Sequence, residues 1–201
     1  MPELTFHNTL SNTREVFVPL SPRKVTMYNC GPTPYDRQHI GNMVPPILAD
    51  IIRRTLEAWG YRVAQVMNIT DFGHLTGDND GNPDIGEDKM TRGLEREGVA
   101  RTMENMRALA EKYASIFFDD VRTLGIDTKR VTYPRASDYI PEQIALIRSL
   151  EQKRYAYETR DGIYYDTSRF AKYGTLGGIN LLGLKAGARV EENREKKNAR
   201  D

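Results

Sequence analysis

The segment Cys30-Gly-Pro-Thr-Pro-Tyr-Asp-Arg-Gln-His-Ile-Gly-Asn42 joins an apolar run at Val25 to Tyr28 to a helical pattern that begins near its last residue. The apolar run has the composition of a buried strand. A strand, a turn broken by glycine and proline, and a helix N-terminus form a place where backbone N–H groups and the helix dipole can hold a phosphate. The segment therefore predicts the first strand and helix of a nucleotide-binding α/β fold.

A helix and a second strand follow this segment. The pattern is helical from residue 44 to residue 59, and Gly60 ends it. The apolar positions predicted to form its buried face are Val44, Leu48, Ile51, Ile52 and Leu56. Arg53, Arg54 and Glu57 are expected to face water. Residues 61–67 then have a mostly apolar, strand-like pattern, and a strand, helix and strand of this length predict a parallel pair with a right-handed crossover. The predicted fold class is α/β, with half of a doubly wound sheet.

Smaller elements are predicted around this unit. Residues 1–20 form a preface, a short hairpin with strands at 4–6 and 15–18 that is expected to lie on the main sheet. Residues 21–85 are expected to hold the first half of a Rossmann-like domain. Residues 86–201 are expected to hold a helical and β-hairpin insertion and an incomplete connective segment.

Within this last region the patterns change several times. Helical patterning resumes near residue 87 and runs to 124 with a break near Gly98, and a further helix is predicted at 141–152. An Arg-Asp-Gly turn predicts a tight hairpin over residues 155–166. The charge run at 190–201, taken in isolation, indicates a disordered or solvated tail.

Composition restricts the class of protein. The chain has 201 residues with 39% hydrophobic content, which is enough for one well-buried domain with a smaller lobe. Lys and Arg number 29 and Asp and Glu 28, for a net charge of +1, so no global field favours nucleic acid or membrane. A single cysteine excludes an intrachain disulfide and fits a reducing compartment. Because no apolar run approaches the roughly 18 residues of a membrane span, we expect a cytoplasmic protein with no membrane partner.

His39-Ile40-Gly41-Asn42 is the first candidate for chemistry. Gly41 at a helix start allows a backbone or ligand to approach closely, and His39 can donate to phosphate oxygens as charge builds in a transition state. The alternative is an ordinary helix cap that contains a polar histidine. A match of four residues leaves both interpretations open.

Cys30 stands at the carboxyl end of the predicted strand, where open α/β sheets place their ligands. A thiolate there could bind a metal or act as a nucleophile. A lone cysteine is also commonly a small buried hydrophobe. The run Asn68-Ile69-Thr70-Asp71 ends the second strand and is expected at the same edge of the sheet, where its polar groups would face a pocket. A plain strand-to-loop transition is the alternative for this run.

The acidic loop at residues 78–84 resembles a calcium loop only superficially. A twelve-residue frame that starts at Asp78 places Pro83 where the required glycine belongs and Lys89 where the bidentate glutamate belongs. We therefore predict a solvated loop.

Taken together and in order, these motifs resemble the N-terminal half of cysteinyl-tRNA synthetase, a class I aminoacyl-tRNA synthetase. The resemblance runs nearly end to end. It rests on Asn8-Thr9-Leu10, Cys30 to Thr33, His39 to Asn42, Asn68 to Asp71, Gly86 to Met90, Pro134-Arg135-Ala136, Tyr173-Gly174 and Ala186 to Val190.

The resemblance implies ATP-dependent activation of L-cysteine to cysteinyl-adenylate, with ATP supplied with Mg²⁺, followed by transfer to tRNA(Cys). It implies that Cys30 is a zinc ligand, and a zinc ion that favours a thiolate over a hydroxyl would separate cysteine from serine. His39 and Asn42 would be the catalytic residues at the ATP phosphates, with Asn42 where the signature of the class has histidine. The residues implied to bind substrate and ATP are Gly31, Pro32, Thr33, His39, Gly41, Asn42, Asn68 and Thr70.

Length is the larger departure from the family pattern. Residues 1–201 precede the family's other zinc ligands, the second half of the nucleotide fold, the Lys-Met-Ser-Lys-Ser loop and the anticodon-binding region. The pair Lys89-Met90 lies in the helical insertion and is not taken for that loop. We expect residues 1–201 alone neither to activate cysteine nor to hold zinc tightly, and to self-associate through an open sheet edge. The full-length enzyme is expected to be a monomer.

Two alternatives remain at this stage. One is a mycothiol-pathway ligase, which makes the same adenylate but transfers cysteine to an amino sugar. The tail at Lys196 to Asp201 favours the synthetase, although Ala199 replaces the proline of its motif. The other is a non-catalytic half-synthetase that binds tRNA or a partner. A truncated reading frame is the competing explanation for the short chain, and it is the one we expect.

Overall fold

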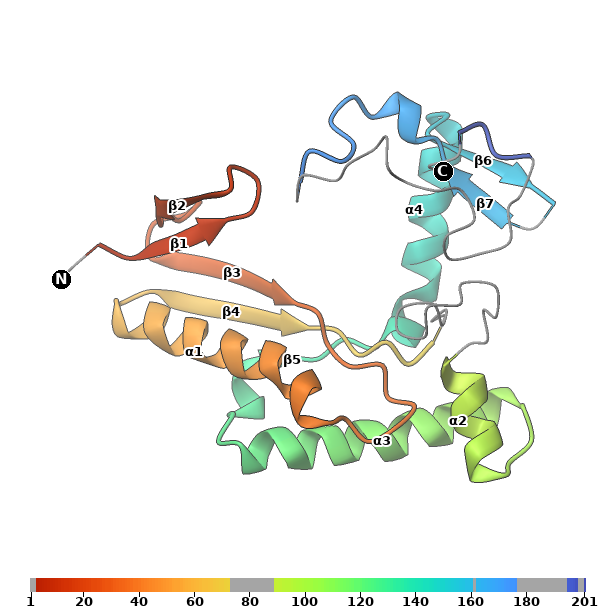
Figure 1. Cartoon of the computed structure of the whole chain (residues 1–201), viewed down its shortest axis with the longest axis horizontal. Coiled ribbons are helices and arrows are strands. Elements are labelled where there is room, and N and C mark those ends of the chain that lie inside the picture. The colour runs from red at the N-terminus through yellow and green to blue at the C-terminus, as the bar shows by residue number, and fades with distance from the viewer. Residues whose placement is uncertain (1–2, 73–88, 161, 177–194, 199–200) are drawn as a thin grey trace. The chain divides into compact units, whose positions relative to one another are not determined.

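The computed structural model describes residues 3–72, 89–160, 162–176, 195–198 and 201, and its elements are labelled in Figure 1. The described residues divide into two compact units. The sheet unit comprises residues 18–72 and 89–139. The hairpin unit comprises the described residues of 3–17 and 140–201. The domain limits predicted at 20/21 and 85/86 stay predictions.

Three parallel strands form the centre of the sheet unit. They are β3 (Lys24–Asn29), β4 (Arg62–Met67) and the short β5 (Val131–Thr132), in the order β3-β4-β5. The register pairs Met27 with Gln65 and Gln65 with Val131. Both predicted strands and their parallel pairing are confirmed.

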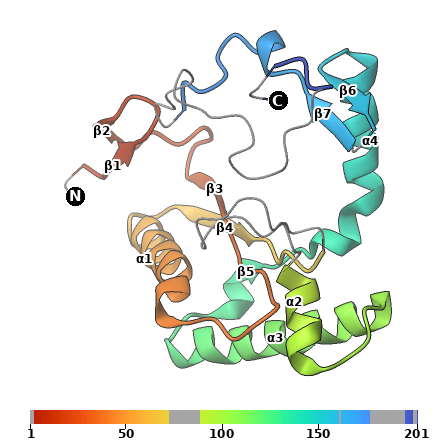
Figure 2. The same cartoon turned by 45° about the vertical axis from the view of Figure 1, so that its right-hand side comes forward.

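Two helices cover one face of this sheet, as both views show (Figures 1 and 2). They are α1 (Val44–Ala58) and α3 (Met103–Thr123). The core between helices and sheet contains Met43, Ala49, Met67, Ile69, Phe117, Val121, Ile126 and Val131. On β3 the residues alternate, so that Val25 and Met27 are half-buried while Thr26 and Tyr28 are exposed. The two strands predicted from the sequence are thus confirmed, and α3 covers the same face of the sheet as α1.

The predicted buried face of α1 is largely wrong. Val44, Leu48 and Ile51 are 59%, 54% and 54% exposed. Only Leu56 is buried as expected, and Arg53, predicted to face water, is 3% exposed. The remaining buried positions are Pro46, Ala49 and Asp50.

Charge pairing and small side chains explain the rotation of α1. Arg53 binds the carboxylates of Asp50 and Glu57, so its charge is neutralised where it is buried. Glu57 also pairs with Arg130, which precedes β5. Ala49 in the core cluster allows the helix to approach the sheet closely. The hydrophobic pattern alone did not contain this information.

The helical region after the sheet begins with α2 (Lys89–Glu97), which packs against α3. Gly98 adopts a φ of +67° between them, a backbone conformation that favours glycine, and so accounts for the predicted break. Short 3-10 turns η1 (Ile40–Met43) and η2 (Thr128–Arg130) precede α1 and β5. None of the helices in the described part of the chain is long and apolar enough to cross a membrane.

The hairpin unit contains two antiparallel pairs and one helix. The first pair is β1 (Thr5–Asn8) with β2 (Thr13–Val16), a two-stranded sheet of its own. Helix α4 (Ile140–Gln152) follows the 3-10 turn η3 (Ala136–Tyr139). It precedes β6 (Ala156–Thr159) and β7 (Gly162–Tyr165), after which comes the turn η4 (Thr167–Arg169). Both hairpins and the helix were predicted.

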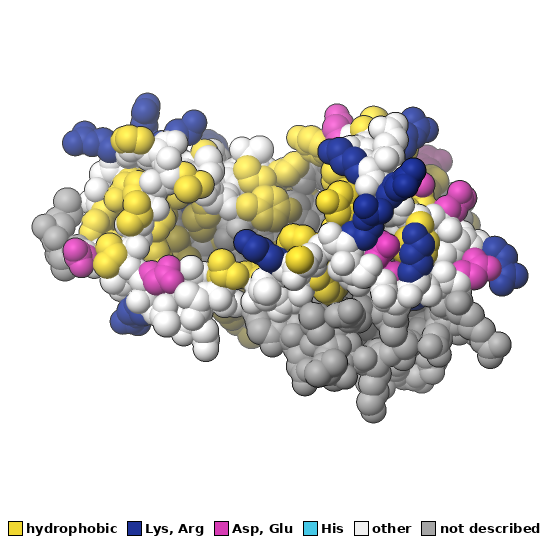
Figure 3. All heavy atoms as spheres, turned by 90° about the horizontal axis from the view of Figure 1, so that it is seen from above, with side chains coloured by type: hydrophobic (Ala, Val, Ile, Leu, Met, Phe, Trp, Pro, Cys, Tyr) yellow, Lys and Arg dark blue, Asp and Glu magenta, His cyan; other side chains and the backbone are white. Residues whose placement is uncertain are grey.

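The end of the chain docks on the second hairpin, which corrects the prediction of a disordered or solvated tail for the part that is described. Asp201 accepts hydrogen bonds from the Thr167 backbone N–H at 2.9 Å and from the Tyr157 hydroxyl at 2.7 Å. The Lys197 ammonium lies 4.2 Å from the centre of the Tyr157 ring. Figure 3 shows exposed Lys and Arg side chains over the part of the hairpin unit that contains α4, β6 and β7, on the right of the view. The acidic loop predicted at 78–84 lies outside the described residues.

Candidate active site

The residues that follow the three parallel strands are joined by hydrogen bonds at the carboxyl edge of the sheet. The Gly31 N–H donates to Asn68 Oδ1 at 3.0 Å, and the Thr70 N–H donates to the Pro32 carbonyl at 3.0 Å. On the other side, the Ile69 N–H donates to the Pro134 carbonyl at 2.8 Å. Segments 30–33, 68–71 and 134–137, far apart in sequence, thus meet at one edge, as the resemblance implied for the first two.

Gly31 is required by this close approach. A Cβ atom at this position would lie 1.7 Å from the Asn68 carbonyl oxygen, far inside van der Waals contact. Asn68 uses both ends of its side-chain amide, because Nδ2 also donates to Thr70 Oγ1 at 2.9 Å. Pro32 is buried and Thr33 is half-buried beside it. The structure brings these predicted residues together, and their direct contact with a substrate stays a prediction.

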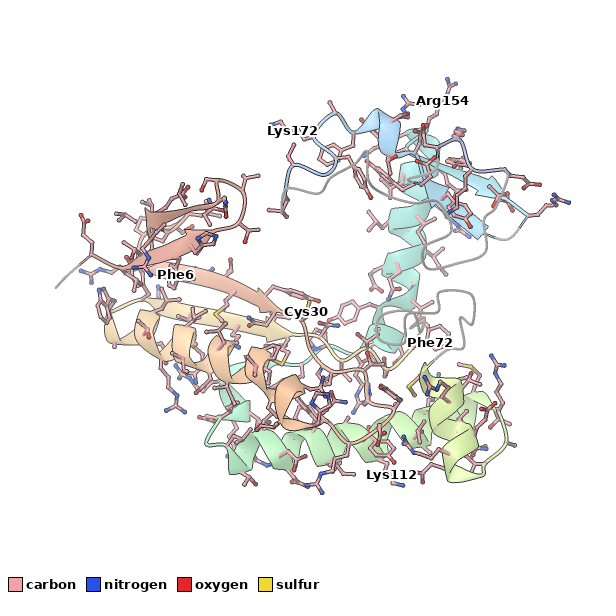
Figure 4. All side chains as sticks on the ribbon, in the orientation of Figure 1. Phe6, Cys30, Phe72, Lys112, Arg154 and Lys172 are labelled. Carbon is pink, nitrogen blue, oxygen red and sulfur yellow. The ribbon has the colours of Figure 1, made fainter. Side chains whose placement is uncertain are left out.

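Cys30 lies at the end of β3 with an exposed free thiol, at the edge of the sheet that Figure 4 shows. Its neighbour Asn29 accepts a hydrogen bond from Gln65 Nε2 at 3.1 Å. No group of three or more His, Cys, Asp and Glu side chains that could hold a metal occurs among the described residues. The described residues therefore do not form a zinc site around Cys30. His74 lies outside them.

His39 and Asn42 cap the turn before α1. His39 Nδ1 accepts from the Gly41 N–H at 3.1 Å, and the His39 N–H donates to Asn42 Oδ1 at 3.2 Å. In a neutral imidazole with an accepting Nδ1, the proton is on Nε2. Since His39 is exposed, its ring can cap the turn and still present an N–H donor to solvent or to a ligand. The two interpretations left open by the sequence are therefore compatible.

Gly41 is next to the His39 ring. A Cβ atom on Gly41 would lie 2.9 Å from His39 Cε1 and 3.0 Å from Nδ1, so any larger residue would displace the ring. The close approach predicted at Gly41 is thus made by the histidine that the same motif contains.

Sequence reasoning missed a polar group at the third strand of this edge. The Asp71 carboxylate accepts from the Ser137 N–H at 3.0 Å and from the Ser137 hydroxyl at 2.6 Å. Arg135 lies 4.0 Å from the same carboxylate and binds Glu111 at 2.6 Å. Ser137 is 66 residues from Asp71, so no local pattern could reveal this contact.

The family of the chain is shown by comparison with known proteins. The family model of the tRNA synthetases class I (C) catalytic domain matches residues 16–201. The chain belongs to this family.

Two curated relatives support this membership of the class I (C) family. A Cysteine–tRNA ligase of Treponema denticola is 43% identical over 198 residues, which cover 98% of this chain. Cysteine–tRNA ligase 1 of Burkholderia lata is 44% identical over 187 residues, or 93% of this chain. The matches span 38% of the length of each of these relatives.

A solved structure shares the fold of this class I chain. The crystal structure of arginyl-tRNA synthetase from Plasmodium falciparum superimposes with a TM-score of 0.52 at 16% identity. It covers 75% of this chain and 30% of that one. At this identity the likeness concerns the fold alone.

Proposed function

We propose that the chain provides one part of the active site of a cysteine–tRNA ligase, which activates L-cysteine with ATP and transfers it to tRNA(Cys). The observation that supports this most directly is the hydrogen-bonded edge formed by Gly31, Pro32, Asn68 and Thr70. The chain also has an exposed histidine at the turn before α1, and its relatives carry that activity in their names. The tRNA in those names favours tRNA over an amino sugar as the acceptor.

Each residue has a physical role in this proposal. Gly31 lets the Asn68 backbone approach closely and so brings segments 30–33 and 68–71 together. The adenylate would lie along the backbone edge that these segments form. Thr33 would line the adenylate there. His39 would donate its Nε2 proton to a phosphate oxygen of ATP, where negative charge increases during adenylate formation. Asn42 accepts the His39 backbone N–H through Oδ1 and would donate from Nδ2 to the ATP phosphates.

Cys30 is the one candidate zinc ligand among the predicted site residues. Its exposed thiol could bind zinc once deprotonated, and a zinc ion held with further ligands would bind the thiol of the substrate. The described residues contain no group of three or more His, Cys, Asp and Glu side chains that could hold a metal, so no step is routed through the ion. The proposal keeps Cys30 as a single candidate ligand and predicts weak zinc binding and no ATP–pyrophosphate exchange by the 201-residue chain.

The remaining parts of the proposal concern the cellular setting. An exposed free thiol at Cys30 suits a reducing compartment, and we place the protein in the cytoplasm. ATP is expected with Mg²⁺, since the cation would neutralise the phosphates. The complete enzyme is proposed to act as a monomer.

Binding of a non-hydrolysable cysteinyl-adenylate analogue to the 201-residue chain, measured by calorimetry, tests the function. The wild-type chain should bind it, and His39→Ala should weaken binding roughly tenfold, the loss of about one charge-assisted hydrogen bond. His7→Ala is the matched control, because His7 is also an exposed histidine but lies in β1. Failure of the wild type to bind, or equal loss in both variants, would contradict the proposal.

A further inference from the structure

The loop from Tyr35 to Gln38 connects the two halves of the candidate site. It follows Thr33, proposed for the adenylate, and precedes His39, proposed for the phosphates. Local contacts hold it in part. Gln38 Nε2 donates to the carbonyls of Thr33 at 3.4 Å and Asp36 at 3.2 Å, the Tyr35 N–H donates to the Thr33 carbonyl at 3.0 Å, and the Arg37 N–H donates to Asp36 Oδ1 at 2.6 Å. Its strongest contacts come from the helical region more than fifty residues later.

Arg96 of α2 binds this loop at two points. Its Nη2 donates to the Tyr35 carbonyl at 2.8 Å, and its Nη1 pairs with the Asp36 carboxylate at 2.5 Å. Nη2 also donates to the Tyr113 hydroxyl oxygen at 3.0 Å, and the guanidinium carbon lies 5.4 Å from the centre of that ring. A planar guanidinium can make these contacts at once, whereas an ammonium cannot.

Gly93, one helical turn before Arg96 on α2, also lies close to this loop. A Cβ atom on Gly93 would lie 2.9 Å from the Tyr35 carbonyl oxygen and 2.6 Å from a methyl group of Leu109. The Tyr35 side chain packs against the apolar cluster of α2 and α3, which includes Met90 and Leu94. Helix α2 therefore meets the loop with a glycine, an apolar cluster and a forked donor.

A second contact comes from α3. Arg37 pairs with Asp120, with Nη2 to Oδ1 at 2.9 Å and Nε to Oδ2 at 3.3 Å. The side chains are 69% and 23% exposed in this pair and 42% and 46% exposed in the pair of Arg96 with Asp36, so water and salt screen both ion pairs. Arg96 is the better candidate for control of the loop because it binds a backbone carbonyl as well as a carboxylate.

We infer that Arg96 is a positioning residue for adenylate formation. It fixes Tyr35 and Asp36 and thereby sets the position of His39 relative to Gly31 and Thr33. This inference rests on the proposed function, since a fixed loop matters only if both ends act on one ligand. It assigns the helices after β4 a role in the chemistry, through the loop and without contact with the substrate.

Amide hydrogen exchange in the ligand-free 201-residue chain tests whether Arg96 holds the loop at Tyr35 and Asp36. Arg96→Met should speed exchange of the hydrogen-bonded amides of Tyr35, Gly41 and Asn42 roughly tenfold, because two or three modest hydrogen bonds are lost. Asp36→Asn should speed the same amides without altering either helix, and Arg96→Lys should restore part of the protection. Arg107→Met, at an exposed arginine of α3, is the matched control and should change none of them.

Binding of the cysteinyl-adenylate analogue separates positioning from mere stability. Arg96→Met should weaken it at least fivefold while Arg107→Met leaves it unchanged. Faster exchange with unchanged affinity would overturn the positioning role, as would protection in Arg96→Met within twofold of the control. If the wild-type chain does not bind the analogue, the proposed function and the positioning role fail together, whereas the exchange data still decide whether Arg96 holds the loop.

Discussion

At the scale of single residues, the candidate site depends on close approach. Gly31 and Gly41 are both needed because a neighbour occupies the place of a Cβ atom, the Asn68 carbonyl in one case and the His39 ring in the other. The two neighbours differ in how easily they move. A backbone carbonyl in a sheet edge is fixed, while a histidine ring at the surface can rotate.

Replacement of Gly31 by alanine should therefore destabilise the sheet unit strongly. With the Asn68 oxygen only 1.7 Å from the added Cβ, the edge must open, and we expect a loss of about 3 kcal/mol in the free energy of unfolding. Urea denaturation measures it. Gly162→Ala is the control, because nothing lies within 4 Å of its added Cβ. Equal stability of the two variants would show that segments 30–33 and 68–71 do not meet as described.

At the scale of elements, the sequence predicted existence and type better than orientation. Predictions that rest on local features were confirmed. These features are the apolar runs of β3 and β4, the turn signal between β6 and β7, and the glycines Gly60 and Gly98 at helix ends. The face of α1 does not follow from its apolar spacing, because Asp50 and Glu57 on the same helix neutralise Arg53 where it is buried. Glu57 also pairs with Arg130, which lies 73 residues further along the chain. The contact of Asp71 with Ser137 likewise joins residues that no spacing relates.

Two leucines of α1 test the corrected face. Leu56 is 2% exposed and Leu48 is 54% exposed. Leu56→Ala should cost about 3 kcal/mol of unfolding free energy through lost burial and a residual cavity, whereas Leu48→Ala should change it by less than about 1 kcal/mol. Thermal or urea unfolding of the two variants gives the comparison. A larger loss for Leu48→Ala would restore the face that the hydrophobic pattern predicted.

The docked tail should respond to acid. Partial burial tends to raise the pKa of Asp201, but hydrogen bonds from Thr167, Tyr157 and Asn198 outweigh it and hold the pKa below its ordinary value of 3.8. A lowered pKa means that docking is at full strength above the ordinary value and weakens as the pH falls through the lowered one.

Exchange of the Thr167 amide, followed from pH 6 down to about pH 1, reports this docking. After correction for intrinsic exchange, protection in the wild type should begin to fall only below the ordinary pKa of 3.8 and be lost toward the acid end. Asp201→Asn should show low and nearly constant protection over the same range. Protection already lost above that ordinary pKa, or an equal pH dependence in the variant, would contradict the role given to Asp201.

At the scale of the whole molecule, the sheet unit presents one covered and one exposed face. Tyr28 on β3 is 66% exposed, and β3 pairs only with β4 among the described strands. An exposed aromatic on an edge strand favours association with another chain. The family resemblance predicted self-association through an open sheet edge, because the chain is shorter than the family pattern. The structure adds that Tyr28 is exposed on the strand β3.

Self-association of the 201-residue chain is accordingly expected. Light scattering after size-exclusion chromatography should show dimers or larger species at micromolar concentration. Tyr28→Lys should shift them toward monomer, because a charge on an edge strand opposes pairing. Lys24→Tyr replaces a charge by an aromatic on the same exposed face of β3 and should increase association. A wild-type chain that stays monomeric over the whole concentration range would show that this face does not drive association.

We propose that the adenylate site lies at the sheet edge formed by residues 30–33 and 68–71, together with the turn at residues 39–42. The most direct measurement is a map of backbone amide NMR shifts as the cysteinyl-adenylate analogue is added to the 201-residue chain. We predict saturable shifts at Gly31, Thr33, Gly41, Asn68 and Thr70, with little change in β1, β2, β6 and β7. Shifts confined to the hairpin unit, or the absence of any saturable shift, would contradict the account.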